Sequence, residues 1–254
     1  AESTAAFGAH TEALFRLGNN EAVIAAAEGA ANVDADIKLA ARGRAEYALG
    51  RGARSGANSL REAMAEAARR GRLESILPDA DALGASTVAD KRLVELCGDP
   101  ALADYAFRVA RERLSRRGRP VLLATALDRA RAASPNSAAA QDFARYAKLL
   151  AGQAVSPSET AAAVAAEPAN TAFRITHALA LLRDGKPSDA LAVFDNVTLF
   201  ANSLPPGQLA VLYAVLAANG DTRRAAAAAR GIDPNALTNE EFALLASHRE
   251  RASD

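Results

Sequence analysis

The chain has 254 residues, of which half are apolar and only 5% are aromatic. Its formal net charge is zero, which excludes a general electrostatic attraction to nucleic acid or to anionic membranes. Much of the apolar half is alanine, which favours helices and lets them approach one another closely. The composition therefore predicts a long, thin helical core rather than a thick globular one.

The sequence excludes some features of the protein's cellular location and leaves two compartments open. The single cysteine, Cys97, excludes an internal disulfide and a cysteine-only metal site. No stretch approaches ~18 consecutive apolar residues, so we predict no membrane span. The alanine- and arginine-rich composition is typical of a GC-rich bacterial genome. The chain begins at Ala1 without a signal-like apolar segment, which fits a processed chain or a fragment of a longer one, in either the cytoplasm or the periplasm.

Helical spacing and helix caps recur along the chain, and no segment shows sustained strand alternation. In the N-terminal third, residues 51–58 are loop-like and Pro78 is expected to interrupt a helix. Further on, apolar side chains recur on one helical face at Phe107, Ala110 and Leu114, and again at Leu209, Leu212, Tyr213 and Leu216. Two capping boxes mark later helix starts, Ser156 with Glu159 and Thr238 with Glu241. The chain is predicted to be all helix and turn.

The turns follow a period near 34 residues. One series of glycines has successive intervals of 34, 34, 34, 33 and 35: Gly50, Gly84, Gly118, Gly152, Gly185 and Gly220, with Gly18 one shorter step earlier. A second series, of prolines, keeps the same period: Pro100, Pro135, Pro168 and Pro234. We interpret the unit as two helices, with a glycine in the turn within the unit and a proline between units.

This unit resembles the tetratricopeptide repeat, in which a glycine closes the first helix and a small residue follows five positions later. Gly84 with Ala89, Gly185 with Ala190, and Gly220 with Ala225 reproduce that step. The resemblance implies a right-handed α-solenoid of stacked antiparallel helix pairs, with about seven repeats. The repeats are regular in residues 85–254, and residues 1–84 are expected to be degenerate helical hairpins. The segment from Pro234 onward is expected to form a capping helix that docks through Phe242, Leu244 and Leu245.

No catalytic constellation is visible, so we predict a protein that is not an enzyme and needs no metal or cofactor. His10, His177 and His248 lie far apart in the sequence. The glycine-rich, zinc and thiol-redox motifs that bind nucleotides or metals are missing. Cys97 and His177 are expected to be packed helix residues rather than reactive groups.

The resemblance implies that the first helix of each repeat lines a concave groove. Alignment on the glycines places five residues there: Arg108, Glu112, Asp142, Tyr146 and Leu179. The leading hypothesis is a scaffold that binds a protein or peptide in this groove, in an unknown oligomeric state. The alternative is a helical-repeat module for a small molecule, a polysaccharide or an anionic ligand. Residues 104–131 have a net charge of +5, which suits an anion, although the neutral whole and the lack of stacking aromatics disfavour nucleic acid.

Overall fold

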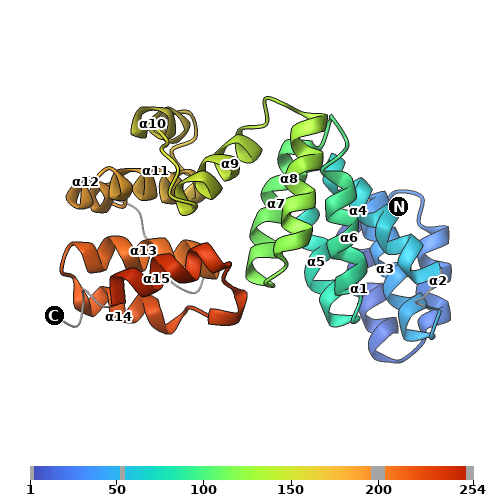
Figure 1. Cartoon of the computed structure of the whole chain (residues 1–254). Helices are drawn as coiled ribbons and strands as arrows, with labels where there is room; N and C mark the ends of the chain where they lie inside the picture. The colour runs from blue at the N-terminus through green and yellow to red at the C-terminus, as the bar shows by residue number, and fades with distance from the viewer. Residues whose placement is uncertain (1–2, 52–54, 196–203, 250–254) are drawn as a thin grey trace. The chain divides into compact units, whose positions relative to one another are not determined.

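The computed structural model describes residues 3–51, 55–195 and 204–249. Every regular element in these ranges is a helix, fifteen α-helices and one 3-10 helix, which confirms the all-α class (Figure 1). None of the described helices is both long enough and apolar enough to span a bilayer. The chain forms two compact units, residues 1–109 and 110–254. The division lies inside helix α7.

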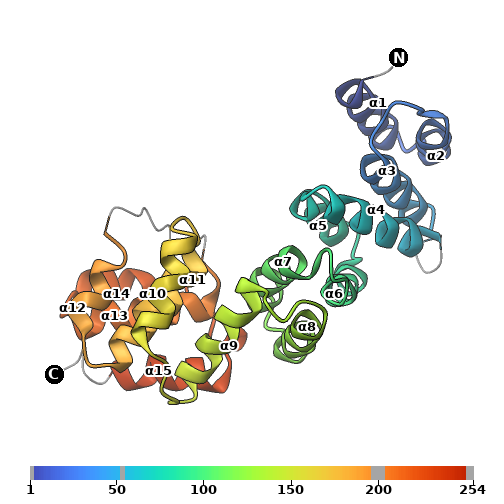
Figure 2. The same cartoon turned by 90° about the horizontal axis from the view of Figure 1, so that it is seen from above.

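The N-terminal unit is a series of helices, each packed on the next, and α1 also contacts α3, α3 contacts α5 and α4 contacts α6. Figure 2 shows α1 to α6 following one another in chain order. Their bounds are α1 Thr4–Arg16, α2 Asn20–Gly29, α3 Ala35–Ala48, α4 Ala57–Arg69, α5 Leu73–Ala82 and α6 Ser86–Leu96, after which α7 spans Ala103–Arg116.

The C-terminal unit continues the alternation of helices and short turns from the end of α7. Its helices are α8 Pro120–Ala133, α9 Ala138–Leu150, α10 Pro157–Ala166, α11 Thr171–Arg183, α12 Pro187–Ala192, α13 Pro206–Ala218, α14 Thr222–Arg230 and α15 Asn239–Arg249, with the 3-10 helix η3 at Pro234–Ala236. Helices α9, α11 and α13 pack in that order, and each also contacts the even-numbered helix that follows it.

The two residue series predicted to mark the turns do so. All seven glycines have positive φ, between 58° and 75°, a conformation that costs glycine little because it has no Cβ. At Gly118, for example, the Arg119 amide donates to the Leu114 carbonyl oxygen at 2.9 Å, as in a Schellman motif. The prolines lie after α6, α8, α10 and α14, between successive helix pairs. The sequence therefore located the helix pairs correctly.

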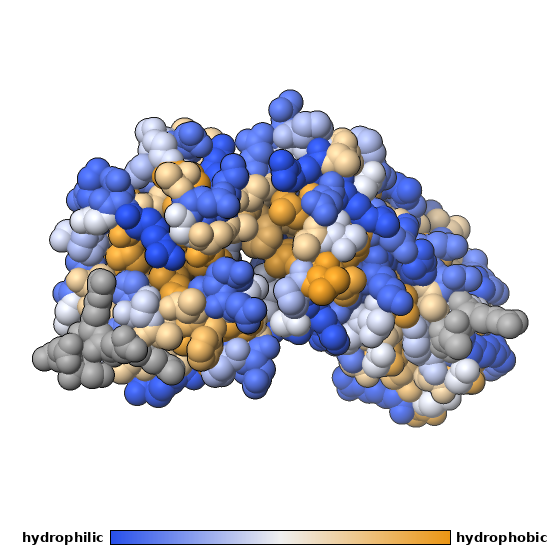
Figure 3. Space-filling model, viewed as in Figure 1, coloured by the Kyte–Doolittle hydropathy of each residue, from blue (hydrophilic) through white to orange (hydrophobic). Residues whose placement is uncertain are grey.

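Alanine lets the helices meet closely, as the composition suggested. Ala89, Ala190 and Ala225, the small residues of the glycine-to-alanine step, are all buried. In the C-terminal unit, one apolar cluster joins α9, α11 and α13, and a second joins α13, α14 and α15. Figure 3 shows apolar surface appearing between hydrophilic residues on this unit.

Two expectations about local structure are wrong. Pro78 does not interrupt a helix but lies inside α5, which continues to Ala82. Phe242 does not dock, because its side chain is on the outer face of α15 and the residue is 49% exposed. The other two predicted docking residues, Leu244 and Leu245, are buried as expected. Of the loop-like segment 51–58, residues 52–54 lie outside the described ranges, and α4 has begun by Ala57.

Candidate functional site

The C-terminal helix begins with a complete capping box. The Glu241 amide donates to Thr238 Oγ1 at 3.2 Å, and the Thr238 amide donates to Glu241 Oε2 at 2.9 Å. Each side chain thus satisfies a backbone donor of the first turn that has no partner within the helix. The second predicted box differs, because Ser156 caps the amide of Ser158 and the Glu159 carboxylate lies 3.7 Å from Arg145.

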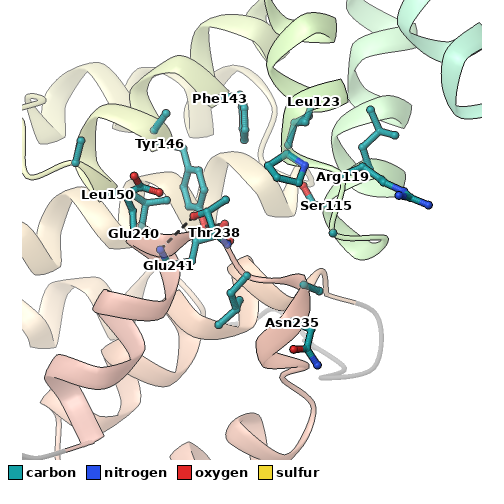
Figure 4. Close-up of a pocket in the computed structure, with 17 residues that line it drawn as sticks. Ser115, Arg119, Leu123, Phe143, Tyr146, Leu150, Asn235, Thr238, Glu240 and Glu241 are labelled. Carbon is teal, nitrogen blue, oxygen red and sulfur yellow. Dashed lines mark hydrogen bonds between the residues drawn. The ribbon is translucent and has the colours of Figure 1, made fainter.

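The other oxygen of Glu241 connects α15 to a helix far away in the sequence. The Tyr146 hydroxyl on α9 donates to Glu241 Oε1 at 2.9 Å, over a separation of 95 residues (Figure 4). Burial raises the pKa of the Tyr146 phenol well above its usual value, and the nearby Glu241 carboxylate raises it further. Tyr146 therefore keeps its proton and remains the donor in this hydrogen bond.

Gly207, in the first turn of α13, leaves room for the Glu241 carboxylate. A Cβ at residue 207 would overlap that carboxylate. The carboxylate also lies at the helix end where the backbone dipole is positive, which favours a negative charge. Glu241 thus links three helices: α15, which carries it, α9 through Tyr146, and α13 through Gly207.

A cavity of about 360 Å³ remains between this C-terminal segment and the helices it covers. Its walls come from the end of α7, the start of α8, α9, η3 and the first turn of α15. Phe143 and Leu123 supply apolar surface, while Arg119, Asn235 and Glu240 supply polar groups (Figure 4). Apolar walls with a few polar groups, in a volume of roughly 300–1,000 Å³, are typical of ligand pockets.

The cavity also depends on a close contact between the α7–α8 turn and η3. A Cβ at Gly118 would lie 3.2 Å from Ala236 Cα and 3.3 Å from the Asn235 carbonyl oxygen. Gly118 therefore serves twice, because it adopts positive φ and leaves space for the C-terminal segment. Without η3 and α15, the wall formed by α8 and α9 would be an open surface.

Behind the aromatic wall lies a buried ion pair. Arg111 Nη1 lies 2.6 Å from Asp142 Oδ2, which also accepts from Thr176 Oγ1 at 3.0 Å, so the contact joins α7, α9 and α11. The Arg111 guanidinium lies over the rings of Phe143 and Tyr146, 5.0 and 5.5 Å from their centroids. Burial raises the pKa of Asp142, and the Arg111 guanidinium opposes that rise. This network fixes the orientation of both rings.

The structure also shows the surroundings of the metal-ligating and thiol side chains. Within the described ranges, no three histidine, cysteine or acidic side chains gather where a metal ion could bind. His177 Nδ1 lies 2.9 Å from Thr160 Oγ1, which joins α11 to α10, and burial lowers its pKa, so the ring is neutral near pH 7. Cys97 is buried at the end of α6.

The five residues that the resemblance placed in the groove have different surroundings. Tyr146 lines the cavity, whereas Asp142 and Leu179 are fully buried, the first in the ion pair and the second in the apolar cluster of α9, α11 and α13. Arg108 is half exposed and lies near Tyr105, and Glu112 is exposed and pairs with Arg116 at 3.2 Å. The structure thus brings Tyr146, Asp142 and Leu179 to one region of the C-terminal unit.

Three arginines of the arginine-rich segment contact acids. Arg111 binds Asp142, Arg116 binds Glu112, and Arg108 lies 3.8 Å from Asp104. Of these acids, only Asp142 lies outside residues 104–131, so the segment keeps most of its positive charge.

The cavity includes residues that sequence reasoning missed, namely Phe143, Leu123 and Glu241. The capping box identified Glu241 as part of a helix start, but nothing local in the sequence indicated a contact with Tyr146. Comparison of the chain with protein-family models, curated proteins and solved structures finds no match.

Proposed function

We propose that the protein is a non-catalytic interaction scaffold that binds a protein or peptide segment on the face formed by α9, α11 and α13. In this proposal the chain is a right-handed α-solenoid of about seven tetratricopeptide-like repeats. Support for the repeat comes from helix pairs that alternate with glycine turns and prolines at one period.

One observation carries the binding proposal: this face already holds a helix, because α15 packs on α13 and reaches α9. Leu244 of α15 joins the apolar cluster that α9, α11 and α13 form. A surface that accepts one helix within the chain has the shape and apolar character needed for a helix from elsewhere. The polar groups around the cavity would add specificity.

Peptide selection on the full chain tests this function. Random peptides at least as long as α15 would be selected on the wild type and on Leu244→Asp, which is designed to expose the covered face. Selected peptides should bind about tenfold more weakly, or worse, when Phe143→Ala is added. Val121→Ala is the control, because Val121 is an apolar residue of α8 that is 78% exposed. Failure to select any peptide on either chain would contradict the proposal.

A second candidate, a small-molecule site, is favoured by the cavity itself. Its volume of about 360 Å³ suits a compact ligand, and Arg119 and Glu240 offer charges of both signs. A thermal-shift screen with small metabolites and sugars tests it. A ligand whose stabilising effect disappears in Leu123→Trp, which fills the cavity, would favour this candidate over the peptide.

A further inference from the structure

We infer that the face covered by α15 recognises a helix that carries a glutamate and, three and four residues later, two leucines. We further infer that α15 occupies this site within the chain until such a partner displaces it. The inference rests on the proposed function and adds to it the chemistry of the partner and a means of regulation. We refer to the covered face, formed by Tyr146 of α9 and by Gly207 and Val215 of α13, as the α15-binding surface.

The first step is the spacing of the residues that α15 buries. Glu241, Leu244 and Leu245 are 9%, 2% and 1% exposed, whereas Phe242 between them is 49% exposed. Positions i, i+3 and i+4 lie on one face of a helix. Leu244 enters the cluster of α9, α11 and α13, and Leu245 enters the cluster of α13 and α14. The surface thus receives three side chains of a defined pattern.

The second step is the selectivity for a carboxylate. The α15-binding surface offers Glu241 the Tyr146 hydroxyl at 2.9 Å and the space above Gly207, in the first turn of the thirteen-residue α13. A neutral apolar side chain in this place would leave the buried hydroxyl without its acceptor. The site therefore favours an acidic residue at the position of Glu241.

The third step is that α15 covers the surface incompletely. The cavity of about 360 Å³ lies directly beneath η3 and the first turn of α15, next to Phe143 and Leu123. Atoms that line a void lose the dispersion contacts that a filled site would give them. A partner whose residues just before the helix fill this cavity gains contacts that the chain's own Asn235 and Leu237 do not make. Such a partner is able to replace α15.

The experiment uses a fluorescent synthetic peptide with the sequence of residues 233–249 and the full chain. In the chain, Leu244→Asp removes a buried leucine of α15 and leaves the α15-binding surface unchanged. Its control is Ala243→Asp, which introduces the same charge at the neighbouring exposed position. Occupation within the chain lowers the apparent affinity for an added peptide by the fraction of open molecules. We therefore expect the peptide to bind Leu244→Asp at least about tenfold more tightly than it binds the wild type or Ala243→Asp.

Peptide variants test the chemistry of the partner. Glu241→Ala in the peptide should weaken binding to the Leu244→Asp chain several-fold, whereas Asp233→Ala, an equal loss of charge at an exposed residue outside the cavity lining, should not. On the wild-type chain, a saturating peptide should speed amide hydrogen exchange in α15 and leave α14 unchanged. If Leu244→Asp loses helical content by circular dichroism, Glu241→Ala in the chain is the milder opening variant and should give the same order of affinities.

Equal peptide affinity for Leu244→Asp and Ala243→Asp chains of wild-type helicity would overturn the occupation of the site by α15. Equal weakening of peptide binding by Glu241→Ala and Asp233→Ala would overturn the carboxylate specificity. These failures differ from failure of the proposed function. If selected peptides bind the chain but lack the glutamate and paired leucines, the binding function stands and this inference does not.

Discussion

Polar contacts stabilise each unit internally, and one contact of the C-terminal unit joins residues farther apart in the sequence than those of the N-terminal unit. In the N-terminal unit, ion pairs with partly exposed partners join helices that pack together: Arg44 lies 2.7 Å from Glu12 and Arg61 lies 2.7 Å from Glu95, while the buried Asp36 pairs with the partly exposed Arg72 at 2.8 Å. In the C-terminal unit, the Arg111–Asp142 pair is buried, and the Tyr146–Glu241 hydrogen bond spans 95 residues. The two ion pairs of partly exposed side chains in the N-terminal unit join residues 32 and 34 positions apart, whereas the Tyr146–Glu241 contact joins elements far apart in the sequence.

The largest expected difference concerns the buried pair. Asp142→Ala should lower the free energy of unfolding by about 3–5 kcal/mol, because it leaves the Arg111 guanidinium buried without its partner. Glu21→Ala removes the exposed partner of Arg51 in the N-terminal unit and should leave stability near that of the wild type. Urea denaturation followed by circular dichroism measures both. Equal losses of stability in Asp142→Ala and Glu21→Ala would mean that the depth of burial of an ion pair does not determine its contribution.

The next prediction concerns a feature that both units share. Ala190→Leu in the C-terminal unit and Ala89→Leu in the N-terminal unit should each destabilise by about 1–3 kcal/mol, because both alanines are fully buried where helices meet closely. Ala192→Leu, at an exposed position of the same α12, is the control. Thermal melts check the series. If Ala190→Leu melts at the wild-type temperature, the prediction that residue 190 must be small because two helices meet closely there is wrong.

A smaller effect should separate long-range from local contacts. Tyr146→Phe should lower stability by about 0.5–1.5 kcal/mol, because the buried Glu241 loses a donor. It should also speed hydrogen exchange in α15. The counterpart in the N-terminal unit is Tyr105→Phe, since the Tyr105 hydroxyl accepts from the Leu73 amide at 2.8 Å and also bonds Glu74. Its effect should stay within α5 and its neighbours, and faster exchange spread along the unit would contradict this expectation.

The smallest effect is the response to acid. The Arg16 and Arg44 guanidiniums lower the pKa of Glu12, and those of Arg72 and Arg70 lower the pKa of Asp34. Because the folded pKa lies below the unfolded one, this stabilisation is present above the usual carboxyl pKa of about 4 and is lost as the pH falls. The pH dependence of stability that Asp142 contributes has the opposite sign. Burial raises its pKa, so its contribution to the free energy of unfolding declines as the pH rises through the folded pKa.

Paired denaturation curves near neutrality and near pH ~3 test the acid response. The variant that combines Glu12→Gln and Asp34→Asn should lose less stability on acidification than the wild type does. An identical loss would show that these exposed pairs do not contribute.

The helix pairs were readable from the sequence because glycine and proline act locally. A residue at positive φ, such as Gly118, needs no distant information to be recognised. The burial of Leu244 and Leu245 also followed from the pattern within one helix. The path of α5 through Pro78 did not, because packing of the helix against its neighbours overrides local preference.

The cavity could be predicted only in part. Alignment on the glycines predicted that Tyr146 faces a groove, and in the structure Tyr146 lines the cavity. Phe143 and Leu123 were missed because their role depends on where η3 and α15 lie after folding. Leu179 and Asp142, which the register predicted to face a groove, are fully buried. A contact over 95 residues, such as that of Tyr146 with Glu241, leaves no periodic trace in a single sequence.

The Tyr146–Glu241 hydrogen bond has a consequence for how this chain can change in length. A helix pair inserted in the N-terminal unit would leave the contacts of the remaining pairs intact. An extra pair between α9 and α13 would move α15 away from α9 by roughly one interhelical distance, 8–10 Å, and no side chain of fixed length would then bridge the gap. The position of α15 is therefore compatible with an added helix pair in the N-terminal unit, but not with one between α9 and α13.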